Sequence, residues 1–300
     1  MIDLRYFHEP PRLGAWFEGY YFKHRGPDGG IALIPAVHRE ADGAKLKASL
    51  QVITDDRSYT FNISNRDFSA KRKQLAIRVG ESRISAAGAA LQITGEGLEL
   101  SGTLRYGPLT PLRTDIMGPF RLAEPVMQCC HGVVSLRHSL SGTLVLNGKP
   151  MCFDGGTGYI ETDRGRSFPA DYLWTQCNWD RNCIMLSVAE IPFLGRRFKG
   201  CICALLHGGR EYRLATYLGV KILRYGPLGA EIRQGAYHLT AELLSGEGRP
   251  LRAPSAGAMT RTIHESLSAR VRYRFWIGSR LLFDHIDENA SYEYADEKDG

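Results

Sequence analysis

The sequence has no apolar run that could cross a membrane and no apolar stretch of signal-peptide length near its start. Residues 1–11 read MIDLRYFHEPP, a mixture of charged residues, aromatic rings and paired prolines. No other segment approaches the roughly 18 consecutive apolar residues of a membrane-spanning helix. We therefore expect a cytoplasmic protein with at most peripheral membrane contact.

Cysteine pairs of the CxxC type are also missing. The seven cysteines are an odd number in a chain of 300 residues, which argues against a disulfide scaffold and for a reducing compartment. Walker and Rossmann glycine patterns and the GxSxG elbow do not occur in the strand-to-helix context that they require. We expect no cofactor, and the small basic excess of +6 without a binding motif predicts no nucleic-acid partner.

No stretch keeps the spacing of an amphipathic helix over three turns, whereas several segments alternate apolar and polar residues at period two. The alternating segments are residues 47–53, 74–79, 97–104, 237–243 and 270–277. Each is bounded by turn-forming residues, which is typical of antiparallel strands. An antiparallel sheet of about eight strands can close into a barrel around one small apolar ligand. The pattern predicts an all-β protein of barrel or sandwich domains with few short helices.

Two features predict a division into two domains. Residues 19–26 (GYYFKHRG) and 158–165 (GYIETDRG) match at a shift of 139, and the same shift pairs residues 93, 100 and 104 with 232, 239 and 243. The proline-rich segment 106–125 between these regions is expected to be a linker or crossover. We therefore predict an N-terminal β domain over residues 1–122, including the linker 106–122, and a C-terminal β domain over residues 123–300.

The segment 127–178 reads MQCCHGVVSLRHSLSGTLVLNGKPMCFDGGTGYIETDRGRSFPADYLWTQCN. It resembles the signature region of the tocopherol cyclase family, HGVVSxxHSLSG followed by FDGGxGYIExDxGRSFP and an aromatic strand ending in QCN. The opening segment 16–23, WFEGYYFK, is similar to the family's FEGWYFK. The resemblance implies two tandem lipocalin-like domains, related in outline to carotenoid hydratases.

The resemblance also implies an isomerase of the intramolecular lyase type. Such a cyclase protonates an olefin in a prenyl tail, and a phenol oxygen then attacks the tertiary cation and closes a ring. The site needs a carboxylic acid kept protonated by desolvation, aromatic faces near the cation and exclusion of water. The alternatives are a carrier that binds an isoprenoid, quinone or lipid without catalysis, and an interaction module with filled barrels; the sequence sets no oligomeric state.

The candidate catalytic residues are Asp163, Glu161 and His131. Strand alternation places Tyr159, Glu161 and Asp163 on one face, and two buried carboxylates raise each other's pKa, as a general acid requires. The alternative is that they pair with arginines or solvent at a barrel rim. The resemblance favours a role for His131, whereas His138, seven residues away, is expected on the opposite strand face, so no metal site is predicted.

The candidate substrate contacts lie on three segments. Alternation places Tyr172, Trp174, Gln176 and Asn178 on one face, where a mixed aromatic and amide surface suits a ring with hydroxyls, although plain core packing is the alternative. The remaining candidates are Tyr159, Arg166, Asp154, Glu18 and Tyr20. A turn explains Asp154 equally well, because Asp-Gly-Gly is turn chemistry, and a structural ion pair explains Arg166 equally well.

Three positions depart from the family pattern. Tyr20 and Arg164 stand where the family has tryptophan, and Gln128 stands where it has an acidic residue. A guanidinium facing the pocket would oppose a carbocation, so the side of the strand on which Arg164 lies bears directly on the reaction.

Overall fold

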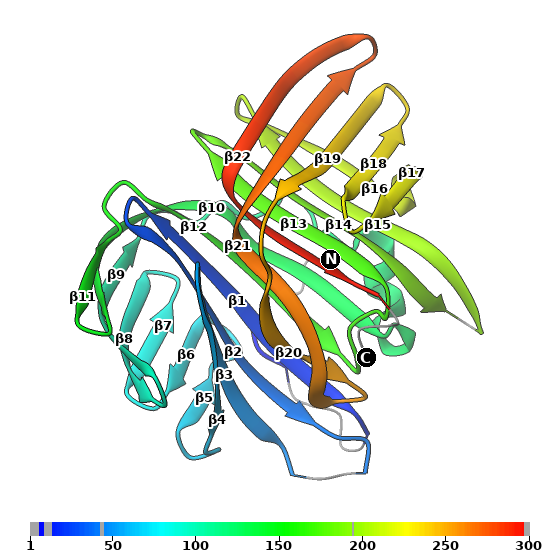
Figure 1. Ribbon diagram of the computed structural model, residues 1–300. Helices are drawn as coiled ribbons and strands as arrows, with labels where there is room; N and C mark the ends of the chain where they lie inside the picture. Colours follow the sequence, from blue (N-terminus) through cyan, green and yellow to red (C-terminus); the bar gives the residue numbers. More distant parts are fainter. Residues whose placement is uncertain (1–5, 9–13, 43–44, 194, 297–300) are drawn as a thin grey trace. The chain divides into compact units, whose positions relative to one another are not determined.

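The computed structural model describes residues 6–8, 14–42, 45–193 and 195–296 (Figure 1). These ranges form two large antiparallel sheets and two short 3-10 helices, η1 (Gly118–Val126) and η2 (Thr216–Leu218). The prediction of an all-β, lipocalin-like architecture with few short helices is confirmed. Neither described helix has the length or the apolar content to span a membrane.

The first sheet has twelve strands in the order β4-β3-β2-β1-β12-β10-β9-β8-β7-β6-β5, with β11 paired to β10. The strands are β1 (Trp16–Gly26), β2 (Gly29–Arg39), β3 (Lys47–Thr54), β4 (Ser58–Ile63), β5 (Phe68–Ala70), β6 (Ala76–Val79), β7 (Ser82–Ser85), β8 (Gly88–Gly95), β9 (Leu98–Tyr106), β10 (Cys129–Leu146), β11 (Lys149–Cys152) and β12 (Thr157–Gly165). The last strand of this set, β12, hydrogen-bonds to the first, β1.

One apolar core lies inside this sheet. Phe22 from β1, Leu33 from β2 and Ile160 from β12 are fully buried there. Phe61 from β4 and Phe68 from β5, at the two ends of the sheet, pack against the same core. A flat sheet could not bring both ends to one cluster, so the sheet curls around its core as a lipocalin-like fold requires.

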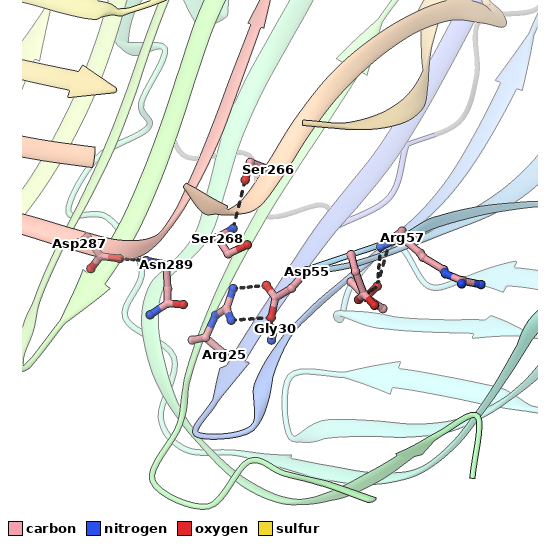
Figure 2. Close-up of polar contacts among 10 residues, drawn as sticks. Arg25, Gly30, Asp55, Arg57, Ser266, Ser268, Asp287 and Asn289 are labelled. Carbon is pink, nitrogen blue, oxygen red and sulfur yellow. Dashed lines mark hydrogen bonds and ion pairs between the residues drawn. The ribbon is translucent and has the colours of Figure 1, made fainter. Parts of the chain in front are cut away.

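A charged pair holds the ends of the first three strands (Figure 2). The Arg25 guanidinium at the end of β1 donates two hydrogen bonds to the Asp55 carboxylate, at 2.9 and 2.6 Å. The backbone N–H of Gly30, at the start of β2, donates to Asp55 Oδ2 at 2.9 Å. Because bidentate arginine–carboxylate pairs fix orientation as well as distance, this contact sets the geometry where β1 ends, β2 begins and β3 ends.

The second sheet has ten strands in the order β16-β15-β14-β13-β22-β21-β19-β18-β17, with β20 paired to β21. The strands are β13 (Tyr172–Trp179), β14 (Asn182–Phe193), β15 (Arg196–His207), β16 (Arg210–Ala215), β17 (Lys221–Gly226), β18 (Gly229–Gln234), β19 (Tyr237–Ser245), β20 (Arg249–Ser255), β21 (Ala258–Ile277) and β22 (Arg280–Ala295). Its own core includes Leu173, Tyr273 and Phe275.

The two sheets share one strand order. The run β4-β3-β2-β1-β12-β10-β9-β8-β7 corresponds strand by strand to β16-β15-β14-β13-β22-β21-β19-β18-β17. The predicted shift of 139 correctly pairs β8 with β18 and β9 with β19. Its first half, which pairs residues 19–26 with 158–165, is wrong, because those segments are the neighbouring strands β1 and β12 of a single sheet. The similar sequences of two adjacent antiparallel strands, β1 and β12, therefore gave a false signal of a domain repeat.

The chain divides into two compact units, each made of three segments. Unit 1 comprises Met1–Pro111, His131–Ser167 and Pro254–Thr260, and unit 2 comprises Leu112–Cys130, Phe168–Ala253 and Arg261–Gly300. This division differs from the predicted boundary between residues 122 and 123. The physical reason is that β10 and β12 complete the first sheet, so most of the signature segment belongs to unit 1.

The predicted linker is shared between the units. Its part from Leu112 onward belongs to unit 2, where the Arg213 guanidinium donates to the carbonyl oxygens of Asp115 and Thr114 at 3.0 and 3.1 Å. The Tyr217 hydroxyl donates to the carbonyl oxygen of Ile116 at 2.9 Å. Side chains thus replace the ladder partners that this proline-rich segment lacks.

The inward position of Ile160 on β12 gives a test of the first sheet. Ile160→Ala is expected to lower the free energy of unfolding by about 2–5 kcal/mol, because it removes a fully buried side chain from the core of unit 1. Urea unfolding followed by circular dichroism measures the change. The control Leu228→Ala alters a side chain that is 67% exposed and is expected to cost less than about 0.5 kcal/mol. Equal effects of the two substitutions would contradict the strand orientation.

Candidate functional site

Tyr159, Glu161 and Asp163 share the face of β12 that points away from the core of unit 1. Ile160, between the first two, is fully buried in that core, so alternation directs its neighbours to the other side of the sheet. His131 comes from β10, the strand beside β12. The three predicted catalytic residues are therefore neighbours in space, within unit 1. We refer to His131, Glu161 and Asp163 as the acid cluster.

Short contacts join the acid cluster. His131 Nδ1 lies 2.9 Å from Asp163 Oδ1, and His131 Nε2 lies 3.3 Å from Glu161 Oε2. The Tyr159 hydroxyl donates a hydrogen bond to Glu161 Oε2. The side chains of Glu161, His131 and Asp163 are 7%, 11% and 22% exposed, so solvent reaches the cluster most easily at Asp163.

The environment of the cluster favours retention of protons. Burial raises the pKa of Glu161 above its ordinary value, although the neighbouring imidazole acts against this rise. Burial alone would lower the pKa of His131, but the Asp163 and Glu161 carboxylates outweigh it and raise the pKa well above its ordinary value. Burial also raises the pKa of Tyr159, which therefore stays a hydrogen-bond donor. Burial thus shifts Glu161 toward its protonated form, while the two neighbouring carboxylates shift His131 toward its imidazolium form.

The acid cluster also contains the residue types of a metal centre, with ligand atoms within 4.8 Å of one another. The contacts described above engage those same atoms in hydrogen bonds and an ion pair. The cluster can therefore share protons among His131, Glu161 and Asp163 without an ion.

His138 lies on the opposite face of β10 from His131, as the spacing of seven predicted. Its ring packs at 4.7 Å from the Tyr106 ring in the interior of unit 1, and its Nδ1 lies 3.1 Å from Ser135 Oγ. Burial lowers the pKa of His138 to about 4, so the ring is neutral near pH 7. A Cβ on Gly158 would come 2.2 Å from His138 Nε2, which explains why glycine precedes Tyr159.

Arg164 lies on the core side of β12, opposite in direction to Glu161 and Asp163. It is 4% exposed and stands across from Glu18 in the β1–β12 register. Its positive charge acts to lower the pKa of the Tyr20 phenol, against the larger effect of burial, and Tyr20 belongs to the core of unit 1. The guanidinium is therefore on the other side of the sheet from the acid cluster.

The sequence proposed Glu18, Tyr20 and Asp154 as substrate contacts, and the structure gives each a local partner. The Glu18 carboxylate accepts the backbone N–H of His8 at 2.8 Å and lies 2.6 Å from the His8 ring nitrogen. Tyr20 stacks against Phe22 in the core. Asp154 accepts the backbone N–H of Gly142 at 2.8 Å, in the turn before β12. The side chain of Arg166, also proposed, is exposed just after β12.

The predicted face of β13 belongs to unit 2. Leu173 and Cys177 point into the core of that unit, so Tyr172, Trp174, Gln176 and Asn178 share the other face, as alternation predicted. The Tyr172 hydroxyl donates to Glu293 on β22, and Gln176 Nε2 donates to Asn178 Oδ1 at 3.0 Å. The amide of Gln128, the third departure from the family pattern, donates to the carbonyl oxygen of Phe168 at 3.2 Å.

Sequence reasoning missed a carboxylate pair beside this face. Glu293 and Glu265 are 7% and 2% exposed and are register partners on β22 and β21. The segment around Glu293, SYEYA, alternates polar and aromatic residues and would have predicted a strand. The pairing with Glu265, 28 residues earlier, depends on irregular strand registers that the sequence does not reveal.

Comparisons with known proteins place the fold. A scan against protein-family models found no match, and a search of curated protein sequences found none. A solved structure of a protein from Nitrosomonas europaea, described as an AttH, has a TM-score of 0.54 and 12% identity and covers 96% of this chain and 95% of that chain.

Two further structures have the same arrangement. CghA, solved with Sch210972, has a TM-score of 0.59 and 11% identity, with coverage of 95% of this chain and 89% of that chain. Kievitone hydratase from Nectria haematococca has a TM-score of 0.53 and 10% identity, with coverage of 95% and 90%. The chain therefore shares with these proteins a fold of two lipocalin-like units, over almost its whole length.

The raised pKa of His131 predicts a pH-dependent contribution to stability. A base whose pKa is raised by folding stabilises the protein fully below its unfolded value of about 6.5, and this contribution is lost as the pH rises through the folded value. The loss of unfolding free energy caused by His131→Gln is expected to be larger near pH 6 than near pH 9, by more than about 1 kcal/mol. Urea unfolding at both pH values measures it. The exposed His264→Gln is the control, and an equal pH response in both variants would contradict the prediction.

Proposed function

We propose that the protein is an intramolecular cyclase of the tocopherol cyclase type, acting on a prenylated phenol, quinol or related isoprenoid. The observation that carries this proposal is the acid cluster, in which a buried carboxyl group of raised pKa lies beside a protonated imidazole. The family-like motif of residues 127–178 supports it, since it contributes all three members of the cluster. The absence of disulfides among the seven cysteines agrees with a cytoplasmic location as part of the proposal.

Glu161 is the proposed proton donor. It is the least exposed member of the cluster, and burial disfavours its charged form, so it holds a proton at a pH where an exposed glutamate would have lost it. The proton moves from the Glu161 carboxyl to the less substituted olefin carbon, and a tertiary carbocation forms on the neighbouring carbon. His131 and Asp163, linked at 2.9 Å, stabilise the carboxylate that remains and relay protons to it.

The phenol oxygen then attacks the cation and closes the ring. One C–H bond and one C–O bond form, the olefin π bond and the phenol O–H bond break, and the phenol proton returns to the cluster. Substrate and product are isomers, so no redox cofactor is consumed. The Tyr21 ring, which stands across from Glu161 in the strand register and packs edge-on against Tyr159, offers an aromatic face to the cation.

Capture of the same cation by water would give a hydration in place of a cyclisation. Kievitone hydratase, one of the proteins that share this fold, is by its name a hydratase. Exclusion of water favours ring closure, and the low exposure of Glu161 and His131 supports that outcome. The β13 face of Tyr172, Trp174, Gln176 and Asn178 remains a predicted substrate surface.

Incubation with prenylated hydroquinones in D2O tests the proposed reaction. We expect an isomeric product with one carbon-bound deuterium, detected by chromatography with mass spectrometry and located by NMR, because the added proton comes from an exchangeable carboxyl group. A product heavier by one water indicates hydration, and tight binding without product indicates a carrier; either result contradicts the cyclase proposal.

The acid itself is tested by substitution. Glu161→Gln is expected to reduce kcat by at least about a hundredfold, since an amide cannot donate the proton, while fluorescence titration shows binding that is nearly unchanged. Asp163→Asn is expected to reduce kcat less and to shift the pH profile. Glu96→Gln, an exposed carboxylate in the β8–β9 turn, is the matched control and retains full turnover. Normal turnover by Glu161→Gln would remove Glu161 from the mechanism.

A further inference from the structure

Unit 2 contains a second cluster of chemically active side chains, on the inward face of its sheet. Cys177 lies on β13, and His285 and Asp287 lie two residues apart on β22, the strand that pairs with β13. We propose that Cys177, His285 and Asp287 form a zinc site. The proposal is independent of the acid cluster, which lies in unit 1, so each can fail without the other.

The geometry suits a small divalent ion. One ligand atom from each of the three side chains lies within 4.8 Å of the other two, and His285 Nε2 is 3.2 Å from Asp287 Oδ2. Tetrahedral zinc, with bonds of about 2.0–2.3 Å, places its ligand atoms about 3–4 Å apart. Small side-chain rotations therefore bring the sulfur, nitrogen and oxygen atoms to bonding distance.

The chemistry of the donors favours zinc over other common cations. A thiolate and an imidazole are ligands that zinc prefers, whereas magnesium and calcium take oxygen ligands almost exclusively. The thiolate of Cys177 and the carboxylate of Asp287 together balance the charge of a divalent ion. This balance matters because Cys177 is fully buried and Asp287 is 8% exposed.

Neighbouring groups hold the ligands in orientation. The backbone N–H of Asn289 donates to Asp287 Oδ1 at 2.8 Å (Figure 2). The other carboxylate oxygen, Oδ2, lies 3.2 Å from His285 Nε2. The Trp179 ring stacks on the His285 imidazole, with centroids 4.5 Å apart and planes 14° apart. Such supporting contacts are typical of metal sites, where they fix the ligand geometry.

Tyr273 completes the surroundings from β21, where it stands across from His285 in the register. Its hydroxyl lies 2.6 Å from Thr175 Oγ1 and interacts with the Cys177 thiol. Three protein ligands leave the fourth tetrahedral position for water or another small ligand, as in zinc sites of the open type. The His285 side chain is 24% exposed, which provides a path for the ion. The competing interpretation is a plain His285–Asp287 ion pair next to a core thiol.

Metal analysis of tag-free, full-length protein separates the two interpretations. We expect about one zinc per chain by mass spectrometry of the metal content, or one-to-one uptake of ZnCl2 by the chelator-treated protein. Cobalt(II) in place of zinc should give the visible spectrum of a four-coordinate site and a thiolate-to-cobalt charge-transfer band. Failure of the parent protein to take up either ion would overturn the proposal.

Single substitutions assign the ligands. Cys177→Ala should abolish the charge-transfer band, and His285→Gln and Asp287→Asn should each weaken zinc binding by at least about tenfold. The matched control is Cys203→Ala, because burial raises the pKa of that core thiol to about 12 and keeps it protonated. A band that survives in Cys177→Ala overturns the assignment. Should a variant fail to fold, the spectrum of the parent decides, since a cobalt site without the thiolate band also overturns it.

Discussion

The pairing of β12 with β1 is the constraint on which the rest of the first unit depends. It joins the run β4-β3-β2-β1 to the run from β12 to β5 in one sheet, and it fixes which residues of β12 enter the core. With Ile160 inside, Glu161 and Asp163 can only project from the other face. A shift of one residue in this register would exchange the two sets and bury carboxylates in an apolar core. Burial of the apolar face of β12 thereby determines the position of the Glu161 and Asp163 carboxylates on its other face.

The acid cluster illustrates how a fold tolerates charge in a poorly solvated place. Removing a carboxylate or an imidazolium from water is costly unless opposite charges and hydrogen bonds replace the lost solvent. Here His131 bridges Glu161 and Asp163, and the Tyr159 hydroxyl supplies one more bond. These contacts do not fully replace the lost hydration of the Glu161 carboxylate, because its pKa is still raised by burial. Replacing buried ion pairs by apolar residues of similar volume is often neutral or stabilising, so stability alone does not account for these three side chains.

Sequence patterns over a few residues predicted correctly which side chains share a strand face. Period-two alternation placed Glu161 and Asp163 together and separated His131 from His138, because the alternation of a strand is independent of the remaining fold. Long-range pairing was harder: the similar letters of β1 and β12 suggested a repeat, whereas they mark two adjacent strands. The domain boundary differed for the same reason. The pairing of Glu265 with Glu293 and the proximity of Cys177 to His285 depend on the registers between strands that are far apart in the chain. Those registers could not be predicted from a single sequence.

The chain passes between the two units more than once, so neither unit is a continuous piece of sequence. A single crossover between genes, or a single proteolytic cut, cannot transfer either unit intact. Separation at residue 122 would strip β10 and β12 from the first sheet and leave β1 and β9 with bare edges, which are prone to aggregation. Each unit is consequently assembled only when the chain is present on both sides of every passage between the units.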